Sequence, residues 1–179
     1  FVGQLVWQKN LKTLVNSLAI LRNMGMGFKM LFAGMGYAAE DLKKMVEDLN
    51  LADRVRFLGT VYDRAYLRSV FCRADLLLFP SLYDTASIVV REAASQKCPS
   101  LLIRGSNTAE GVTDGVNGLL SENTPEAIAQ RIFDAVNQND LSEIGERAHD
   151  TLYRNWESIV DEVYGRYEEI AKTYKILRA

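Results

Sequence analysis

Two acidic residues, Asp84 and Glu92, bracket the start of an expected helix, with seven residues between them. A short apolar run that is typical of a strand, Leu76–Phe79, ends at Pro80 just before this segment. Open α/β folds bind ligands at loops that lead from the carboxyl end of a strand into a helix, where free amides favour a phosphate. A carboxylate only accepts hydrogen bonds, so it suits sugar hydroxyls and repels phosphate. Amides for an anion, flanked by acceptors for hydroxyls, predict a site for a nucleotide sugar.

The same acids also have an interpretation that needs no ligand, in which Asp84 caps a loop and Glu92 is a solvated helix residue. The context favours a site, because Glu92 interrupts an otherwise apolar helix that a parallel sheet should bury, and a buried acid needs a partner or a ligand. Lys9 stands just before another expected helix, where its ammonium group can reach a phosphate. Taken alone, Lys9 is better explained as an ordinary solvated lysine.

Strand-like and helix-like patterns alternate along residues 1–123. Short, unalternating apolar runs are typical of parallel strands covered on both faces, and they occupy Val2–Val6, Phe28–Ala33, Val55–Leu58, Leu76–Phe79, Ser100–Ile103 and Gly118–Leu120. Apolar residues at helical spacing predict helices, with Asn10 capping the first, over Leu11–Arg22, Glu40–Leu49, Tyr66–Phe71 and Ile88–Ala94. The alternation predicts an α/β fold, a doubly wound (Rossmann-like) parallel sheet of about six strands with helices on both faces.

Residues 124–179 are expected to be helical. Thr124-Pro125-Glu126 is a helix-start signature, and helices are predicted over Pro125–Asn137, Leu141–Tyr153 and Asn155–Lys175. The last helix carries an aromatic-rich stripe of Trp156, Ile159, Val163, Tyr167, Ile170 and Tyr174. Packing on its own domain explains part of this stripe, and the length of the helix predicts that the rest docks on something absent from this chain.

The composition is that of a soluble globular protein, since 48% of the 179 residues are hydrophobic and 25% are charged. A net charge of -2 without a basic stripe predicts no nucleic-acid partner. No apolar run is long enough to span a bilayer. Cys72 and Cys98 lie outside any metal spacing and are expected to be two buried thiols in a reducing compartment. Because the chain begins at Phe1 within a strand-like run, it is expected to be a fragment.

Other ligand chemistries find little support. Gly34-Met35-Gly36 and the following residues match a dinucleotide-binding fingerprint, but the next strand ends in Gly59-Thr60 without the acid that would hold a ribose. We therefore interpret these glycines as a tight turn. His149, the only histidine, lies on a helix away from the expected ligand edge, which leaves no Ser-His-Asp or Cys-His set. No zinc constellation and no Asp-X-Asp pair is present, so no cofactor and no metal are expected.

Taken in order, the motifs resemble the carboxy-terminal domain of GT-B fold glycosyltransferases, specifically the retaining family four, the group 1 transferases. The resemblance covers nearly the whole chain and rests on Phe1-Val2-Gly3-Gln4-Leu5 with Lys9-Asn10, Phe32-Ala33-Gly34-Met35-Gly36, Asp53-Arg54-Val55-Arg56-Phe57-Leu58-Gly59, Ala74-Asp75 through Pro80-Ser81, the Asp84–Glu92 segment with Ala93-Ala94, and Asp114-Gly115-Val116-Asn117-Gly118-Leu119-Leu120. Asn155-Trp156 is similar to the family's final crossover helix. The resemblance implies one half of a GT-B fold: a single nucleotide-sugar-binding domain over residues 1–179, with the amino-terminal acceptor domain missing.

The resemblance also implies a role for each position of the expected site. Asp84 would hold hydroxyls of the transferred sugar, Glu92 the ribose hydroxyls, and Lys9 the diphosphate, and these three are the expected catalytic residues. The amides of one loop would meet the diphosphate, and its residues are Thr85, Ala86, Ser87 and Ile88. A backbone stretch would border the nucleobase, formed by Arg56, Phe57 and Leu58.

Three departures from the family pattern bear on this site. Gln4 follows Gly3 where the family usually has an arginine, which removes one positive charge near the diphosphate. Asp84 is one methylene shorter than the usual glutamate, so its reach to the sugar is reduced. Thr85-Ala86-Ser87 replaces a loop that normally carries two glycines. These departures affect which sugar is bound more than whether a nucleotide binds.

The expected function is the donor-binding half of a glycosyltransferase (a hexosyltransferase) that passes a sugar, with retention, from a nucleotide-diphosphate sugar to a cell-envelope, lipid or polysaccharide acceptor. The fragment alone is expected to be inactive. Two alternatives stay open: a nucleotide-sugar epimerase of the same architecture, and a degenerate, non-catalytic nucleotide-binding or scaffold domain. The expected partners are the sugar donor and the missing amino-terminal domain, through which any membrane contact would be made. The expected location is cytoplasmic, with peripheral attachment at the inner face of the membrane as an option.

Overall fold

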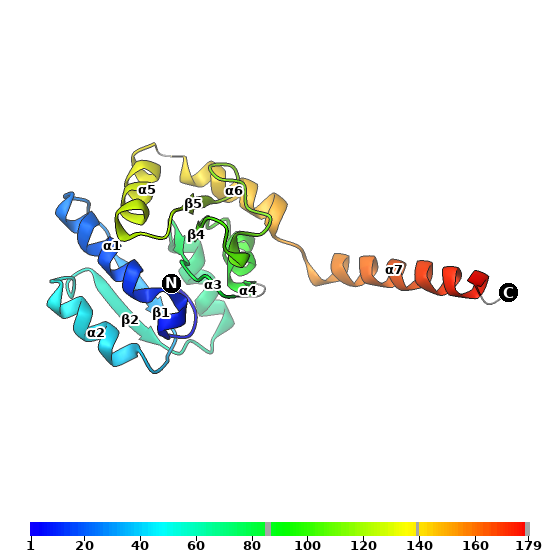
Figure 1. The fold of residues 1–179 in the computed structure, drawn as a ribbon, viewed down its shortest axis with the longest axis horizontal. Coiled ribbons are helices and arrows are strands. Elements are labelled where there is room, and N and C mark those ends of the chain that lie inside the picture. Colours follow the sequence, from blue (N-terminus) through cyan, green and yellow to red (C-terminus); the bar gives the residue numbers. More distant parts are fainter. Residues whose placement is uncertain (85–86, 139, 178–179) are drawn as a thin grey trace.

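The computed structural model describes residues 1–84, 87–138 and 140–177, and Figure 1 shows its fold. Its strands are β1 (Met30–Ala33), β2 (Val55–Gly59), β3 (Leu77–Leu78), β4 (Ser100–Ile103) and β5 (Leu119–Ser121). Its helices are α1 (Leu11–Asn23), α2 (Ala39–Asp48), α3 (Arg64–Arg73), α4 (Ile88–Ser95), α5 (Pro125–Gln138), α6 (Leu141–Leu152) and α7 (Trp156–Leu177), with short 3-10 turns η1 (Trp7–Lys9) and η2 (Asn107–Ala109). Strands and helices alternate up to β5, so the predicted α/β class is confirmed.

All strand pairs in the described part of the chain are parallel. β1 pairs with β2, and β4 lies between β3 and β5. The first residues of the chain run between these two groups, since Ala33 N donates to the Phe1 oxygen at 2.9 Å and the Phe1 ring stacks on Phe79 with 5.6 Å between centroids. Because parallel strands share one direction, their carboxyl ends meet at a single edge, where ligands bind in open α/β folds.

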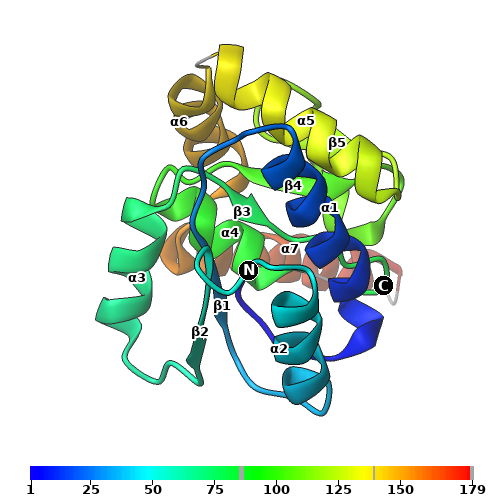
Figure 2. The same cartoon turned by 90° about the vertical axis from the view of Figure 1, so that its left-hand side faces the viewer.

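Helices cover both faces of these strands. On one face α1 contacts α2 and α5, and on the other face α4 contacts α3 and α6, as Figures 1 and 2 show. Each helix buries one stripe, which in α1 consists of Leu11, Leu14, Val15, Ser17, Leu18 and Leu21. Coverage on both sides explains why every residue of β3 and β4 is buried.

Two local predictions about the first residues are wrong. The strand expected over Val2–Val6 is reduced to a single isolated bridge between Val2 and Ala33, which leaves one strand fewer than expected in the described part. The cause is a change of hydrogen-bond partner after Gly3, whose φ is +150°: Leu5 N donates to the Met35 oxygen at 3.0 Å, so the chain follows the β1–α2 loop. Asn10 precedes α1 as predicted, but its side chain makes no capping bond there.

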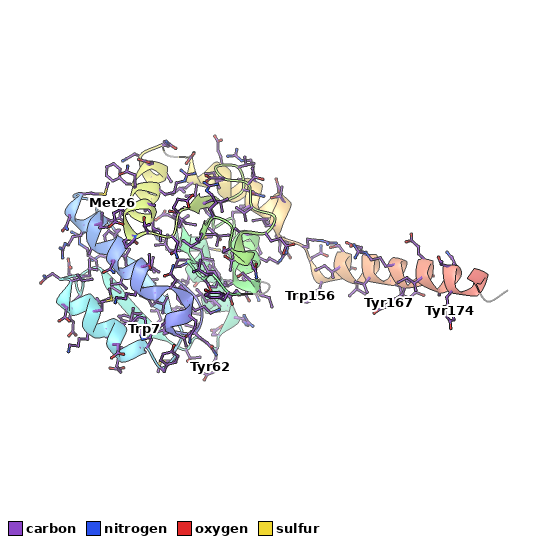
Figure 3. All side chains as sticks on the ribbon, in the orientation of Figure 1. Trp7, Met26, Tyr62, Trp156, Tyr167 and Tyr174 are labelled. Carbon is purple, nitrogen blue, oxygen red and sulfur yellow. The ribbon has the colours of Figure 1, made fainter. Side chains whose placement is uncertain are left out.

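The end of the chain differs from the rest of the fold. α5 begins at Pro125 as predicted, and Ala127 N donates to Thr124 Oγ1 at 3.1 Å. α7 projects away from the body of the domain, and its labelled aromatic side chains stand outside that body in Figure 3. Trp156 and Tyr167 are 78% and 69% exposed, so the expected packing of part of the stripe on its own domain is largely wrong. No helix among the described residues is long and apolar enough to cross a membrane.

The two cysteines differ in exposure, which corrects the expectation that both are buried. Cys98 is 1% exposed, whereas Cys72 faces solvent because α3 turns Leu67 and Phe71 toward the core instead. Burial raises the pKa of Cys98 to about 12, so its reactive thiolate is scarce at neutral pH.

This difference predicts the thiol chemistry of the chain. We expect DTNB to react with Cys72 in the folded chain and with Cys98 only after unfolding, because the reagent needs an accessible thiolate. The absorbance of the released thiol should report one equivalent in buffer and two in guanidinium chloride. Fast reaction of two equivalents in the folded chain would contradict the burial of Cys98.

Candidate functional site

The loop between β3 and α4 contains three buried oxygen atoms that have no hydrogen-bond partner among the described residues. They are Ser81 Oγ, Asp84 Oδ2 and Ser87 Oγ. Buried polar groups in folded proteins are nearly always hydrogen-bonded, so each exception requires an explanation. Three such atoms within residues 81–87 indicate a place where a ligand supplies the missing partners.

The start of α4 is open to an anion. Ser87 precedes the helix without a side-chain capping bond, and the first turn contains no acidic residue. Helix amino ends carry a partial positive charge and N–H groups without an intrahelical acceptor. The first part of the loop before the helix is anchored by buried Phe79, Pro80 and Ser81. The position therefore suits a phosphate group.

Lys9 and Asp84 form an ion pair beside this loop. Lys9 Nζ donates to Asp84 Oδ1, and the two side chains are only 20% and 23% exposed. The ammonium group also lies 5.6 Å from the centre of the Phe79 ring, within range of a cation–π contact. The fold thus brings together two predicted site residues that are 75 positions apart in the sequence.

Asn10 holds Lys9 opposite the β3–α4 loop. Its Nδ2 donates to the Pro80 oxygen at 3.2 Å and to Asn123 Oδ1 at 2.6 Å, which ties the start of α1 to two other loops. Its φ of 61° is left-handed, a conformation that asparagine tolerates, and it turns the chain from η1 into α1. Asn10 therefore has a role that differs from the helix cap predicted from the sequence, and its place directly after Lys9 is the sequence signal for it.

Gly34 and Gly36 allow two backbone segments to touch at the ligand edge. A Cβ atom on Gly34 would lie 1.9 Å from the Gly3 oxygen, and one on Gly36 would lie 2.2 Å from the Leu5 oxygen. The interpretation of these glycines as a tight turn is therefore incomplete, since close backbone approach also requires them. The contact fixes the segment that leads to Lys9.

Glu92 has a partner on the neighbouring helix, as a partly buried acid requires. Arg64 Nη1 donates to Glu92 Oε1 at 2.7 Å, and the two side chains are 70% and 32% exposed. The pair stands in a groove lined by Arg64, Leu67, Arg68, Phe71, Glu92, Ser95 and Trp156. Exposed ion pairs contribute about 0–1 kcal/mol, so Glu92 can exchange Arg64 for another donor at little cost.

The other predicted site residues lie around the same edge or within the strands that lead to it. Gln4 is exposed and Ile88 is 66% exposed at the start of α4. Phe57 stacks on Phe32 with 5.2 Å between ring centroids, and the same two residues are partners in the register of β1 and β2. In the same strand Arg56 is exposed and Leu58 is half-buried. Thr85 and Ala86 lie outside the described residues.

The Asp114–Leu120 part of the family-like pattern has a structural role. Asp114 accepts hydrogen bonds from Leu120 N and the Arg131 guanidinium, both at 2.9 Å, and from Arg104 at 2.8 Å. Burial alone would raise the pKa of Asp114, but these donors lower it below its ordinary value. Asn117 is 5% exposed and its side chain donates to the Gly111 oxygen at 3.1 Å. These bonds fix the connection between β4 and β5.

The ligand edge therefore offers an ammonium group, a helix amino end and the carboxylate of Asp84, while Glu92 lies four residues into α4, where it pairs with Arg64. Lys9 and the start of α4 supply positive charge for an anion, and the carboxylates supply acceptors for hydroxyl groups. Within residues 1–84, 87–138 and 140–177, no three His, Cys, Asp or Glu side chains gather into a metal-binding group. The set of groups can bind a ligand that carries both an anion and several hydroxyls.

Comparison with known proteins gives the family. The family model described as Glycosyl transferases group 1 matches residues 1–151. LpsE of Rhizobium meliloti, a lipopolysaccharide core biosynthesis glycosyltransferase, is 30% identical over 168 residues, which are 89% of this chain and 46% of LpsE. Alpha-D-kanosaminyltransferase of Streptomyces kanamyceticus is 26% identical over 128 residues, which are 70% of this chain and 33% of that protein. The chain thus spans from a third to about half of the length of these relatives.

Solved structures share the fold. S. aureus TarM, in a complex that includes UDP, matches with a TM-score of 0.81 at 22% identity, over 92% of this chain and 34% of that chain. The C-terminal domain of a group 1 family glycosyl transferase (LpcC) from Francisella tularensis matches with a TM-score of 0.75 at 17% identity, over 85% of this chain and 81% of that chain. These likenesses confirm the Rossmann-like fold of a GT-B domain. Because this family model matches most of the chain, from residue 1 to residue 151, the chain belongs to the group 1 glycosyl transferase family.

Proposed function

We propose that this chain is the carboxy-terminal, donor-binding domain of a retaining family-four glycosyltransferase that takes a sugar from a nucleotide-diphosphate sugar. The observation that carries the proposal is the β3–α4 loop, where three buried oxygen atoms have no hydrogen-bond partner among the described residues and where Asp84, which holds one of them, pairs with the Lys9 ammonium group. Membership of the group 1 family supports sugar transfer. Likeness to the LpcC C-terminal domain supports the domain assignment.

In the proposed complex the diphosphate lies over the start of α4. Lys9 and the loop amides bind the diphosphate, Asp84 accepts hydrogen bonds from hydroxyls of the transferred sugar, and Glu92 accepts them from the ribose. The backbone at the end of β2, near Arg56 and Leu58, borders the nucleobase. Asp84 precedes the start of α4 and Glu92 follows it. This separation supports the assignment of the two carboxylates to different parts of the ligand, the transferred sugar and the ribose.

The chemical contribution of this domain is to stabilise the leaving group. As the bond between the sugar and the diphosphate breaks, negative charge grows on the diphosphate oxygens. In this proposal Lys9 and the amides before α4 stabilise that charge, and each preorganised donor of this kind typically contributes about 3 kcal/mol to lowering a barrier. The proposal invokes no metal ion for this step.

The acceptor site and any catalytic base belong, in this proposal, to an amino-terminal domain outside this chain. The exposed aromatic stripe of α7 supports such a partner, because a helix with this apolar surface is suited to crossing onto a second domain. The acceptor is a cell-envelope, lipid or polysaccharide molecule, a class that the similarity to LpsE, a lipopolysaccharide core biosynthesis glycosyltransferase, supports. We place the enzyme in the cytoplasm, with any membrane attachment made by the missing domain.

The test of this proposal is calorimetric titration of the chain with UDP, GDP and ADP, followed by Glu92→Ala. We expect Glu92→Ala to weaken the preferred nucleotide about 10- to 100-fold, because two hydrogen bonds from the ribose to a carboxylate are lost. The 2′-deoxy nucleotide should be affected less, since it offers one hydroxyl fewer.

Glu47→Ala is the matched control, because Glu47 is an exposed acid near the far end of α2 and the change removes the same charge. Equal affinities of wild type and Glu92→Ala would remove Glu92 from the site. Failure of the wild-type chain to bind any of the three nucleotides would overturn the proposal in favour of a degenerate scaffold domain.

A further inference from the structure

The Lys9–Asp84 ion pair places an acceptor on the same ammonium group that the proposed diphosphate needs. Asp84 Oδ1 accepts from Lys9 Nζ, while Asp84 Oδ2 is buried and has no partner among the described residues. Within the part of the chain that the structure describes, the carboxylate is therefore held by one donor. Any anion that binds Lys9 must compete with a negative charge that is already in contact with it.

We propose that Asp84 sets the preference of this site for the sugar-bearing donor over the free nucleoside diphosphate that is the product. This inference rests on the proposed function and adds a specificity role to a residue so far assigned only to sugar contact. A nucleoside diphosphate that binds Lys9 displaces Asp84 and leaves its partly buried carboxylate next to a second anion. The sugar donor also displaces Asp84 from Lys9. The hydroxyls of its sugar, however, donate hydrogen bonds to Asp84 and so take the place of the lost lysine.

The physical basis is an exchange of partners. In the free chain, Lys9 and Asp84 neutralise each other in a place where both are about four-fifths shielded from solvent. Removing the lysine from a shielded carboxylate is costly unless other donors take its place. The donor brings such groups in its transferred sugar, whose hydroxyls can donate to Asp84, whereas the free nucleotide has hydroxyls only on its ribose. After sugar transfer those hydroxyls leave with the sugar, so the returning Lys9–Asp84 pair favours release of the product.

The test uses Asp84→Asn, which keeps the shape of the side chain and removes its charge. We expect this variant to bind UDP about tenfold more tightly than the wild-type chain, because the competing and repelling charge is gone. UDP-glucose should gain less or lose affinity, so the ratio of the dissociation constants of UDP and UDP-glucose falls. Calorimetry or a thermal-shift titration measures both ligands.

Two further variants keep the result specific. Asp48→Asn removes an exposed charge in the last turn of α2 and should leave the affinity for UDP unchanged. Asp84→Asn in a Lys9→Ala background should give a smaller gain in UDP affinity than in the wild-type background, because part of the gain acts through Lys9. If Asp84→Asn raises the affinity for UDP by the same factor in the Lys9→Ala variant as in the wild-type chain, the proposed exchange of partners between Lys9 and Asp84 is wrong.

The outcomes separate this inference from the proposed function. If the wild-type chain binds UDP and Asp84→Asn binds it no more tightly, the role of Asp84 is wrong and the donor-binding function stands. If neither the wild-type chain nor Asp84→Asn binds UDP, GDP or ADP, the proposed function is overturned and the inference with it. Tighter UDP binding together with a lower ratio of the two dissociation constants supports the inference.

Discussion

Lys9→Ala is expected to weaken the binding of UDP about 30- to 100-fold, one of the largest losses that a single side chain of the site should cause. Lys9 supplies a full positive charge beside the start of α4, and the uncharged Gln4 adds none. Without Lys9, the charge of Asp84 is also left unneutralised next to the diphosphate. Isothermal titration of the purified chain measures the loss directly.

The controls for Lys9→Ala address charge and folding. Lys12→Ala removes an exposed lysine three positions further on in α1 and should leave the affinity for UDP unchanged. Adding Asp84→Asn to Lys9→Ala removes the unneutralised carboxylate, so it should restore the unfolding temperature and recover only part of the affinity. An affinity of Lys9→Ala within threefold of the wild-type value would show that Lys9 is not a diphosphate ligand.

Gly36→Ala is expected to reduce the free energy of unfolding by about 3 kcal/mol or more. The added Cβ atom would lie 2.2 Å from the Leu5 oxygen and 2.6 Å from the Leu5 carbonyl carbon, and backbone atoms cannot rotate away as a side chain can. The same carbonyl accepts a hydrogen bond from Ala38 N at 3.0 Å, which the shift would also disturb. Urea unfolding followed by circular dichroism measures the change.

Gly27→Ala is the matched control for this substitution. Nothing lies within 4 Å of the Cβ position of Gly27, and its φ is not in the left-handed region. We expect its unfolding free energy to stay within about 1 kcal/mol of the wild-type value. Equal midpoints for Gly36→Ala and Gly27→Ala would contradict the close approach of the two backbone segments. A destabilised Gly36→Ala chain should also bind UDP less well, because Leu5 leads directly to Lys9.

Much of the fold could be predicted because it depends on local patterns. The apolar spacing of Leu11–Arg22 indicated α1 almost to the residue, and the Ser100–Ile103 run has the bounds of β4. Thr124 and Pro125 marked the start of α5 because a hydroxyl cap and a proline at the first helical position satisfy local backbone requirements. These signals act over a few residues, so no distant contact is needed to interpret them.

The errors occurred where distant partners decided the conformation. Val2–Val6 has the composition of a strand, but beyond Gly3 the backbone forms hydrogen bonds with the β1–α2 loop instead of with a strand. The apolar pattern of the sequence contains no information on this change of hydrogen-bond partner. Cys72 was expected to be buried, yet it faces solvent because α3 presents Phe71 to the core. The stripe of α7 was visible in the sequence, whereas its projection from the domain was not.

The sequence alone determined which chemical groups are available and which elements hold them, because residue types and apolar periodicity act locally. It placed Asp84 and Glu92 around the start of a helix and Lys9 before another. Only the tertiary structure decided which groups meet: Lys9 contacts Asp84 across 75 positions, and Glu92 pairs with Arg64 across 28. The physical reason is that a side-chain ion pair between segments depends on how strands and helices pack in space, and sequence spacing does not encode that geometry.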